Sequence, residues 1–481
     1  MKRKLSASND LTVCFTSFVA DAFIRDRIMF CKELFPYPLN DYEIKTFYVR
    51  QCYIDVFELL TARIERGKKK FGISGTPGVG KSMFFLYILF RVLKGESSFK
   101  PKKIMYQNDL EFLCYEFSTE NELIVKKYSR HEAYMDTVLQ KADTLYIIDG
   151  NEGSPISSRC ITVFISSPGS NDYKRFIMQN MATEWYFPVW TLDELKACRD
   201  NCYQGLPEEF LKERYLMFGG IARFIFWDWI DQIDRNGIPQ KLATDLECAL
   251  NDETAVRNIV RPPQLLKVFN TIHSLLHIIV DRNYRYSKVG VASDYIAHEI
   301  CVRHYNYMIS HLQTFLGGSP SVISRHLFEI YGNRVFSMGG KKLNCRDLQN
   351  ENNQESFEIY LQKFDLPTTS FRQNTIPLAL PTSYYETSDD DTFPAIDAIS
   401  PQGMFQFTVE SEHPIRGIQV LKKVCKLFKD QQKEPKLFFV VPTHQFSSFK
   451  KQVFVGKSGN SSVQEIQELK QYVLELPVGI K

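Results

Sequence analysis

Several features that define whole classes of protein are missing from this sequence, and each absence excludes some of those classes. The eleven cysteines among 481 residues are odd in number, scattered, and form no CxxC pair. This argues against a zinc ribbon or a disulfide scaffold and predicts reduced thiols in an intracellular compartment. No apolar run reaches membrane-spanning length. The formal net charge is only +3, so any basic surface for nucleic acid has to be local.

The first residues, MKRKLSASND, are basic but are not followed by the apolar segment that a signal peptide needs. We therefore expect no secretion signal here, and no translocation header is evident. The Lys-Arg-Lys triplet is a weak candidate for nuclear import, and a solvated tail is the simpler explanation.

One short stretch carries a specific chemical motif, because residues 75–82 match the pattern GxxxxGK[ST]. An apolar segment leads into it and a strongly apolar helical segment follows. Glycines let backbone N–H groups converge on phosphates, and the helix start directs its positive dipole end at them. We predict that Lys81 reaches the β- and γ-phosphates of ATP and that Ser82 ligates Mg²⁺. The predicted nucleotide-binding residues of this loop are Gly75, Thr76, Pro77, Gly78, Val79, Gly80, Lys81 and Ser82.

Two later apolar runs, residues 142–150 and 160–169, have the pattern of buried parallel strands. The first run ends at Asp149, which we predict to complete the Mg²⁺ site. No Glu follows Asp149 directly, so the nearest acid that could activate water is Glu152. Slow hydrolysis, or a nucleotide used mainly as a switch, is therefore a second hypothesis.

Further side chains are candidates for sensing the γ-phosphate. Ser166 and Ser167 end the second run, and Ser167 is the predicted sensor; hydroxyls that cap the turn before Pro168 are an equal alternative. Arg223 follows a Gly-Gly break and could reach the phosphates from a helical lid, or could form a salt bridge on a helix surface instead.

Six segments occur in a fixed order between residues 47 and 227: YVRQCY, GTPGVGKS, LYIIDG, FISSPGS, FPVWTLDEL and FGGIARF. Together they resemble the NTPase module of Crinkler and retrotransposon-hot-spot-type effector proteins. The resemblance implies an ATPase related to the AAA and signal-transduction NTPase groups, with Lys81, Ser82 and Asp149 in their expected roles and Arg223 as a sensor. It also implies a C-terminal toxin-like enzyme domain, often a restriction-endonuclease-like nuclease and sometimes a kinase, and action in the nucleus of a host cell.

Beyond residue 317 the expected order is helix, several strands, helix, strand, which is the core order of a restriction-endonuclease fold; the glycine loop and catalytic loop of a kinase are missing. Such a nuclease needs carboxylates that hold Mg²⁺ near the scissile phosphate. The usual pattern is an Asp at a strand bend and ExK on the next strand. Asp397 stands at the Asp position. Gln406, Thr408 and Glu410 share one strand face by period two, with Gln406 and Thr408 in place of the Glu and the Lys.

Other residues would complete this nuclease site. Glu329, on the preceding helix, resembles the additional acid of many such nucleases. Thr408 cannot supply a positive charge, so Lys423 or its neighbour Lys422 on the following helix would replace the lysine. His413 is expected to be a loop residue rather than a base. Strand acids and open-face polar residues are also common without chemistry, so a nuclease-like fold that binds nucleic acid without cutting it is the alternative.

The sequence thus predicts an α/β protein, with a P-loop NTPase of the AAA or signal-transduction type, a helical lid and a restriction-endonuclease-like domain. The predicted function is ATP binding and hydrolysis joined to Mg²⁺-dependent cutting of DNA, gated by nucleotide state. The alternative is an NTPase switch whose C-terminal domain binds nucleic acid or a host protein. Expected partners are nucleotide, DNA and further copies of the chain, and the expected location is the nucleus, in a host cell after secretion. The predicted segments are an unassigned 1–45, an NTPase core 46–190, a helical lid or connector 191–316 and a nuclease-like domain 317–481.

Overall fold

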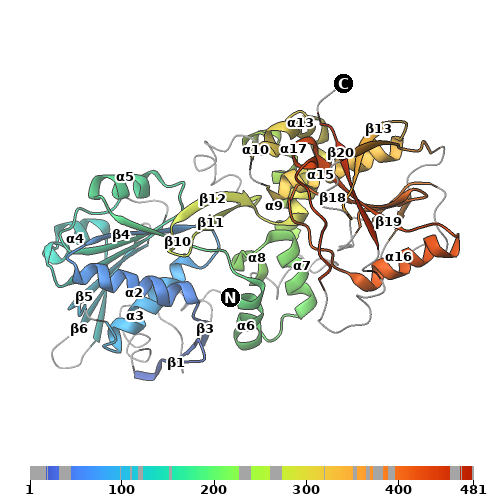
Figure 1. The fold of residues 1–481 in the computed structure, drawn as a ribbon. Helices are drawn as coiled ribbons and strands as arrows, with labels where there is room; N and C mark the ends of the chain where they lie inside the picture. The colour runs from blue at the N-terminus through green and yellow to red at the C-terminus, as the bar shows by residue number, and fades with distance from the viewer. Residues whose placement is uncertain are drawn as a thin grey trace. The chain divides into compact units, whose positions relative to one another are not determined.

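A computed structural model of the chain divides into two units, Met1–Ile296 and Ala297–Lys481 (Figure 1). Among the described residues no helix combines the length and the apolar character needed to cross a membrane. The structure describes residues 18, 20–31, 45–97, 99–108, 111–117, 123–150, 154–226, 240–259, 274–318, 320–349, 355–364, 369–371, 383–387, 396–455, 466 and 469–478.

A seven-stranded sheet forms the centre of the first unit, from β4 (Lys70–Gly75), β5 (Lys103–Asn108), β6 (Glu111–Phe117), β7 (Leu123–Tyr128), β8 (Thr144–Asp149), β9 (Ile161–Ile165) and β10 (Thr183–Phe187). Its order is β10-β4-β9-β8-β5-β6-β7. The strands from β10 to β5 are parallel, and β6 and β7 continue the sheet antiparallel. β8 and β9 are buried along their whole length, which confirms the two buried strands predicted from their apolar runs.

Helices cover both faces of this sheet: α2 (Gln51–Glu65) and α3 (Phe84–Leu93) on one, α4 (Arg130–Met135) and α5 (Asn171–Asn180) on the other. Side chains alternate along the strands, so each face has its own core. On β5, Ile104 packs with α2 and α3, whereas Met105 packs with α4 and α5. Residues 84–90 of α3 are all buried, which accounts for a helix that is apolar all round. Two short 3₁₀ turns complete this layer, η2 (Lys81–Met83) and η3 (Thr137–Gln140).

A small antiparallel sheet and a set of helices flank this core. The small sheet consists of β1 (Phe23–Arg25), β2 (Ile28–Phe30) and β3 (Thr46–Tyr48). After β10, Thr191 and Glu194 form a capping box that begins α6. The helices that follow are α6 (Leu192–Cys202), α7 (Glu208–Phe218), α8 (Ala222–Phe226), α9 (Gln240–Asn251) and α10 (Glu253–Ile259).

The segment 191–316, predicted as a helical lid or connector, also contains two strands that were not expected. There β11 (Leu276–Val280) and β12 (Tyr286–Val291) form an antiparallel hairpin. Its turn is built locally, because the Asp281 carboxylate accepts N–H groups from Asn283 and Arg285. The Asp and Asn of this turn are visible in the sequence, but the strands on either side carry too weak a pattern to mark a hairpin.

The second unit contains an eight-stranded mixed sheet and its helices. The sheet order is β14-β13-β20-β19-β18-β17-β16-β15. The predicted order of helix, several strands, helix and strand is present as α15, the strands β14 to β18, α16 and β19, whereas β13 and β20 were not foreseen. The elements after β12 are α12 (Asp294–Arg303), α13 (Tyr305–Ile309), α14 (Leu312–Leu316), α15 (Val322–Met338), β13 (Lys342–Asp347), β14 (Ser356–Tyr360), β15 (Thr369–Phe371), β16 (Tyr385–Thr387), β17 (Ala398–Ser400), β18 (Gly403–Phe407), α16 (Ile418–Asp430), β19 (Lys436–Pro442), α17 (Thr443–Phe446) and β20 (Lys470–Leu476).

The centre of this second sheet is formed by consecutive elements. β17 and β18 make a tight antiparallel hairpin, and α16 then carries the chain to β19, which lies parallel to β18. α16 is strongly amphipathic: Leu421, Val424 and Phe428 are buried, while its lysines lie toward the other side. Both units are therefore α/β, as the sequence predicts.

Candidate functional site

The loop at residues 75–82 lies at the edge of the first sheet where the parallel strands end. β4 ends at Gly75, which pairs with Phe187 at the end of β10. β8 ends at Asp149, which pairs with Ile165 at the end of β9. In parallel α/β sheets this carboxyl edge is where ligands bind. The strand order therefore brings the loop and the predicted acid to one edge of the sheet.

The glycines of the loop occupy conformations and spaces that other residues do not tolerate. Gly78 and Gly80 have φ angles of 85° and 94°. A Cβ on Gly78 would lie 2.8 Å from Ile221 Cγ2, and one on Gly80 would lie 2.7 Å from the Tyr53 hydroxyl oxygen. Glycines with positive φ at these two positions let the backbone N–H groups of the loop turn toward a phosphate, which is what a phosphate-binding cradle requires.

Lys81 directly follows this cradle, and its ammonium group folds back onto the loop backbone. Its Nζ donates to the carbonyl oxygens of Gly75 (3.0 Å) and Thr76 (3.1 Å). Burial lowers the pKa of Lys81 to about 7; the Asp149 carboxylate opposes this shift and the Arg223 charge adds to it. An anion bound in the cradle would stabilise the charged form of this lysine, so the residues fit a phosphate group.

Asp149 is held by two hydroxyl donors. Its Oδ1 accepts from Ser82 Oγ at 3.0 Å, and its Oδ2 accepts from the Tyr106 hydroxyl at 2.8 Å. A serine hydroxyl and a carboxylate in direct contact beside the cradle are oxygen ligands of the kind Mg²⁺ prefers. The structure thus brings together the two residues, Ser82 and Asp149, that were predicted to hold this ion.

The predicted sensors lie nearby in different ways. Arg223 donates its backbone N–H to the carbonyl of Gly78 at 3.1 Å, so its backbone lies beside the loop. Ser166 and Ser167 are buried directly after β9, and the Ser167 carbonyl accepts an N–H at the turn that leads into α5. Glu152 lies outside the described residues.

Sequence reasoning gave no role to Arg50, a fully buried cation that the structure places against the loop. Its guanidinium donates to the Glu194 carboxylate at 3.0 Å and to three backbone oxygens, those of Val79 (3.3 Å), Pro188 (2.9 Å) and Val189 (3.2 Å). A buried charge requires several partners. An arginine inside the apolar segment YVRQCY was therefore a signal that could have indicated such a role.

The β11–β12 hairpin is a second neighbour of the loop that the sequence did not reveal. The Ile278 N–H donates to the Thr76 hydroxyl at 2.9 Å. At the hairpin tip, the Tyr284 carbonyl accepts the N–H of Tyr186 at 2.7 Å, and the Tyr284 hydroxyl donates to the Asp55 carboxylate. The hairpin is therefore fixed to the loop, to the edge strand β10 and to α2.

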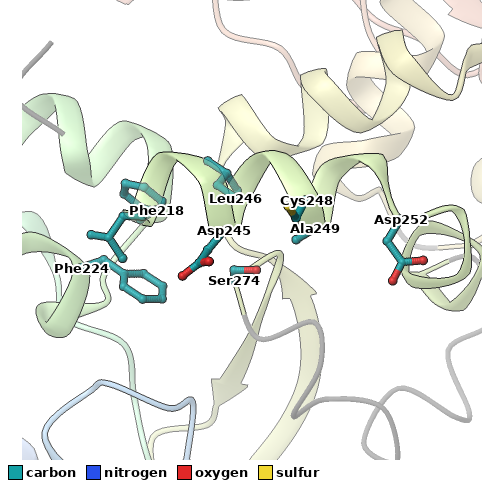
Figure 2. Close-up of a pocket in the computed structure, with 9 residues that line it drawn as sticks. Phe218, Phe224, Asp245, Leu246, Cys248, Ala249, Asp252 and Ser274 are labelled. Carbon is teal, nitrogen blue, oxygen red and sulfur yellow. The ribbon is translucent and has the colours of Figure 1, made fainter. Parts of the chain in front are cut away.

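A pocket of about 360 Å³ lies between the end of α7, the start of α8, α9 and the beginning of β11 (Figure 2). Phe218 and Phe224 lie side by side at one end of it and Asp252 at the other. The Asp252 carboxylate accepts N–H groups from Thr254 and Ala255, so it caps α10. None of the residues predicted for either site lines this pocket.

In the second unit, Asp397 lies immediately before β17 and faces β18. One of its oxygens, Oδ2, accepts from the Gln406 amide and from the Phe407 N–H, both at 2.7 Å. Burial raises the pKa of Asp397 well above its ordinary value and the Glu329 charge adds to this, while the hydrogen bonds and Arg325 oppose it. The structure thus brings Asp397, Gln406 and Glu329 into one neighbourhood.

The remaining residues predicted for this strand face do not lie on the strand. β18 ends at Phe407, so neither Thr408 nor Glu410 lies on the strand with Gln406, and the prediction of one shared strand face is wrong for both. The reason is local: the Thr408 hydroxyl accepts the Glu410 N–H at 3.1 Å and the chain bends. Lys423 is exposed on α16. His413 lies in a loop, as predicted, where burial lowers its pKa although the Glu410 charge opposes this. Within the described parts of the chain, no three His, Cys, Asp or Glu side chains are grouped to hold a metal ion.

Comparison with known proteins shows a distant relationship. The chain is 23% identical over 446 residues to Crinkler effector protein 15 of Phytophthora infestans, and 24% identical over 446 residues to Crinkler effector protein 16 of the same organism. These matches cover 89% of this chain, which spans 66% of the length of the curated relatives it matches. No protein-family model matches the chain. The chain is therefore distantly homologous to Crinkler effector proteins, as its six segments predict.

Proposed function

We propose that the first unit is a P-loop NTPase that binds and hydrolyses ATP with Mg²⁺ at residues 75–82. The observation that carries this proposal is the hydrogen bond from Ser82 to Asp149, which joins the end of the glycine cradle to the end of β8. The sheet order supports it as well, because a single parallel strand, β9, lies between β4 and β8, so that the loop and Asp149 lie at the same edge of the sheet.

The chemistry of each residue indicates the role it would have in ATP binding and hydrolysis. The backbone of the cradle and Lys81 would bind the phosphates, and Ser82 and Asp149 would hold Mg²⁺. The ion would neutralise charge that develops on the transferred phosphoryl group. Arg223, beside Gly78, would add a positive charge from the helical segment.

Nucleotide binding and phosphate release by the full chain test this proposal. We expect Lys81→Ala and Asp149→Asn to abolish both, while Lys69→Ala, which removes an exposed lysine of the same unit, leaves them unchanged. Wild-type protein that neither binds ATP nor releases phosphate from it would refute the proposal.

For the second unit we propose a restriction-endonuclease-like domain that acts on DNA with Mg²⁺. The specific observation is the position of Asp397 between the β17–β18 hairpin and the Glu329 charge, on a sheet in which α16 links parallel strands β18 and β19. Asp397, Glu329 and the amide oxygen of Gln406 would be the metal-binding groups. Burial and the Glu329 charge raise the pKa of Asp397, and a bound cation would stabilise the charged form of this carboxyl.

Plasmid DNA incubated with Mg²⁺, with ATP present or absent, separates the nuclease from its alternative. Cutting by the wild type that Asp397→Ala abolishes would support the nuclease. DNA that is retained in a mobility shift but stays intact would instead favour the alternative, a switch with a binding module, since Gln406 and Thr408 stand where a nuclease has Glu and Lys. We further propose that ATP gates this activity, and unchanged cutting by Lys81→Ala would contradict the gating.

The names of the two relatives support a role as an effector. We propose that the chain acts inside a host cell, in its nucleus. Imaging of a fluorescently tagged full chain expressed in host cells tests this, and fluorescence excluded from nuclei would refute it.

A further inference from the structure

The carbonyl of Val79, in the middle of the loop, accepts two hydrogen bonds from outside the loop. Trp190 donates its indole N–H to this oxygen at 2.9 Å, and Arg50 donates at 3.3 Å. The two donors support each other, because the Arg50 guanidinium lies 4.5 Å from the centre of the Trp190 ring. Both side chains are buried, so these bonds are shielded from water.

The carbonyls on either side of Val79 are bound in the same way. The Gly80 oxygen accepts from the hydroxyl of the fully buried Tyr53 at 2.7 Å. The Gly78 oxygen accepts the backbone N–H of Arg223 at 3.1 Å. Three successive carbonyl groups of the loop are therefore held by donors that come from α2, its N-terminal neighbour, the segment after β10 and the start of α8.

Because the peptide bond is planar, the directions of these three carbonyl groups also fix the directions of the N–H groups that follow them. In a trans peptide the C=O of one residue and the N–H of the next point in opposite directions. The carbonyls of Gly78, Val79 and Gly80 are directed at their outside donors. The N–H groups of Val79, Gly80 and Lys81 are therefore directed away from those donors, as successive N–H groups are in an anion-binding nest.

We propose that Tyr53, Arg50 and Trp190 are positioning residues that hold the loop backbone in its phosphate-binding arrangement before a nucleotide arrives. They touch no phosphate themselves and act only through the carbonyls of Val79 and Gly80. The advantage is preorganisation, because a loop already in its bound shape loses less conformational freedom on binding. This inference rests on the proposed ATP site, and it gives the segments YVRQCY and FPVWTLDEL a shared purpose.

Two conservative variants of the full chain test the inference, each with a matched control. Tyr53→Phe removes one hydroxyl and keeps the ring, and its control is Tyr87→Phe, which removes a core hydroxyl bonded to Arg91 instead. Trp190→Phe removes the indole N–H, and its control is Trp185→Phe, a buried tryptophan whose ring stacks on Phe71. The measurement is the Kd for Mg²⁺–ATP by isothermal titration, at a temperature where circular dichroism shows every variant folded.

We expect Tyr53→Phe and Trp190→Phe each to weaken ATP binding about 2- to 13-fold, the change expected for one neutral hydrogen bond. Both controls should bind ATP as the wild type does, even where they lower the melting temperature. Equal Kd values for wild type and both test variants would overturn the inference and leave the proposed ATP site standing. A wild type that binds no ATP would overturn the proposed site and this inference together.

Discussion

Replacing Gly80 by alanine perturbs the loop in two separable ways. The residue has a φ of 94°, and an alanine held there costs about 1–2 kcal/mol in the free energy of unfolding. In addition, the new Cβ would lie 2.7 Å from the Tyr53 hydroxyl oxygen, while the next ring atom is 4.0 Å away. Overpacking of this kind costs about 1–3 kcal/mol more. The structure therefore predicts a total loss of about 2–5 kcal/mol for Gly80→Ala.

A double-mutant cycle distinguishes the two contributions. In a Tyr53→Phe background the clashing oxygen is gone, so Gly80→Ala should cost only its φ strain and the cycle should show about 1–3 kcal/mol of coupling. Gly95→Ala is the control, because Gly95 has a φ of 70° and a Cβ added there would meet nothing within 4 Å, so it should show strain alone. The assay is urea denaturation of the four proteins of the cycle. Strict additivity of the two single changes would refute the packing that we describe around the loop.

Three further predictions concern the charges of the two sites. Ser82→Ala should weaken ATP binding about 10- to 100-fold in Mg²⁺ and far less in EDTA, which paired Kd measurements would show. Lys81→Met should stabilise the chain at pH 7 by at most about 4 kcal/mol, because the pKa of Lys81 is lowered in the folded state. Between pH 7 and 10.5 the unfolded state binds more protons than the folded state, so this gain in stability should shrink as pH rises. Denaturation at several pH values would reveal the trend. Asp397→Asn should also stabilise the folded chain at neutral pH, because burial and Glu329 raise the pKa of the native carboxyl. This gain in stability should shrink on acidification. A melting temperature at pH 7 below that of the wild type would contradict the prediction.

The parts of the fold that the sequence predicted are those encoded over short stretches. The runs that became β8 and β9 are apolar throughout, and burial on both sheet faces is what such runs are suited to. The cradle at residues 75–82 is equally local, since it depends on residues within a few positions of one another. Asp149 could be placed because a strand end fixes where its last side chain lies.

The parts that were missed depend on contacts between segments far apart in the chain. Ile278 reaches Thr76 across 202 positions and Arg50 reaches Val189 across 139, and no local pattern encodes either hydrogen bond. The β11–β12 hairpin is fixed in part by the Ile278–Thr76 bond, which no pattern within its own strands encodes. In the second unit the chain bends after β18, where the Thr408 hydroxyl accepts the Glu410 N–H, and period-two reasoning treats Thr408 as an ordinary strand residue.

The two candidate sites share an electrostatic feature that neither sequence motif states. In the first unit burial lowers the pKa of Lys81, so the native protein disfavours this positive charge until an anion lies near it. In the second unit burial and Glu329 raise the pKa of Asp397, so that site disfavours a negative charge until a cation lies near it. Groups whose pKa values are shifted in this way cluster at functional sites, because a ligand of opposite charge recovers the free energy that burial costs. The two sites differ in how well the buried charge is already bonded. Lys81 donates only to neutral backbone oxygens, which accept more weakly than a phosphate would, whereas Asp397 already accepts two N–H bonds. A ligand should therefore stabilise the charge of Lys81 more than that of Asp397.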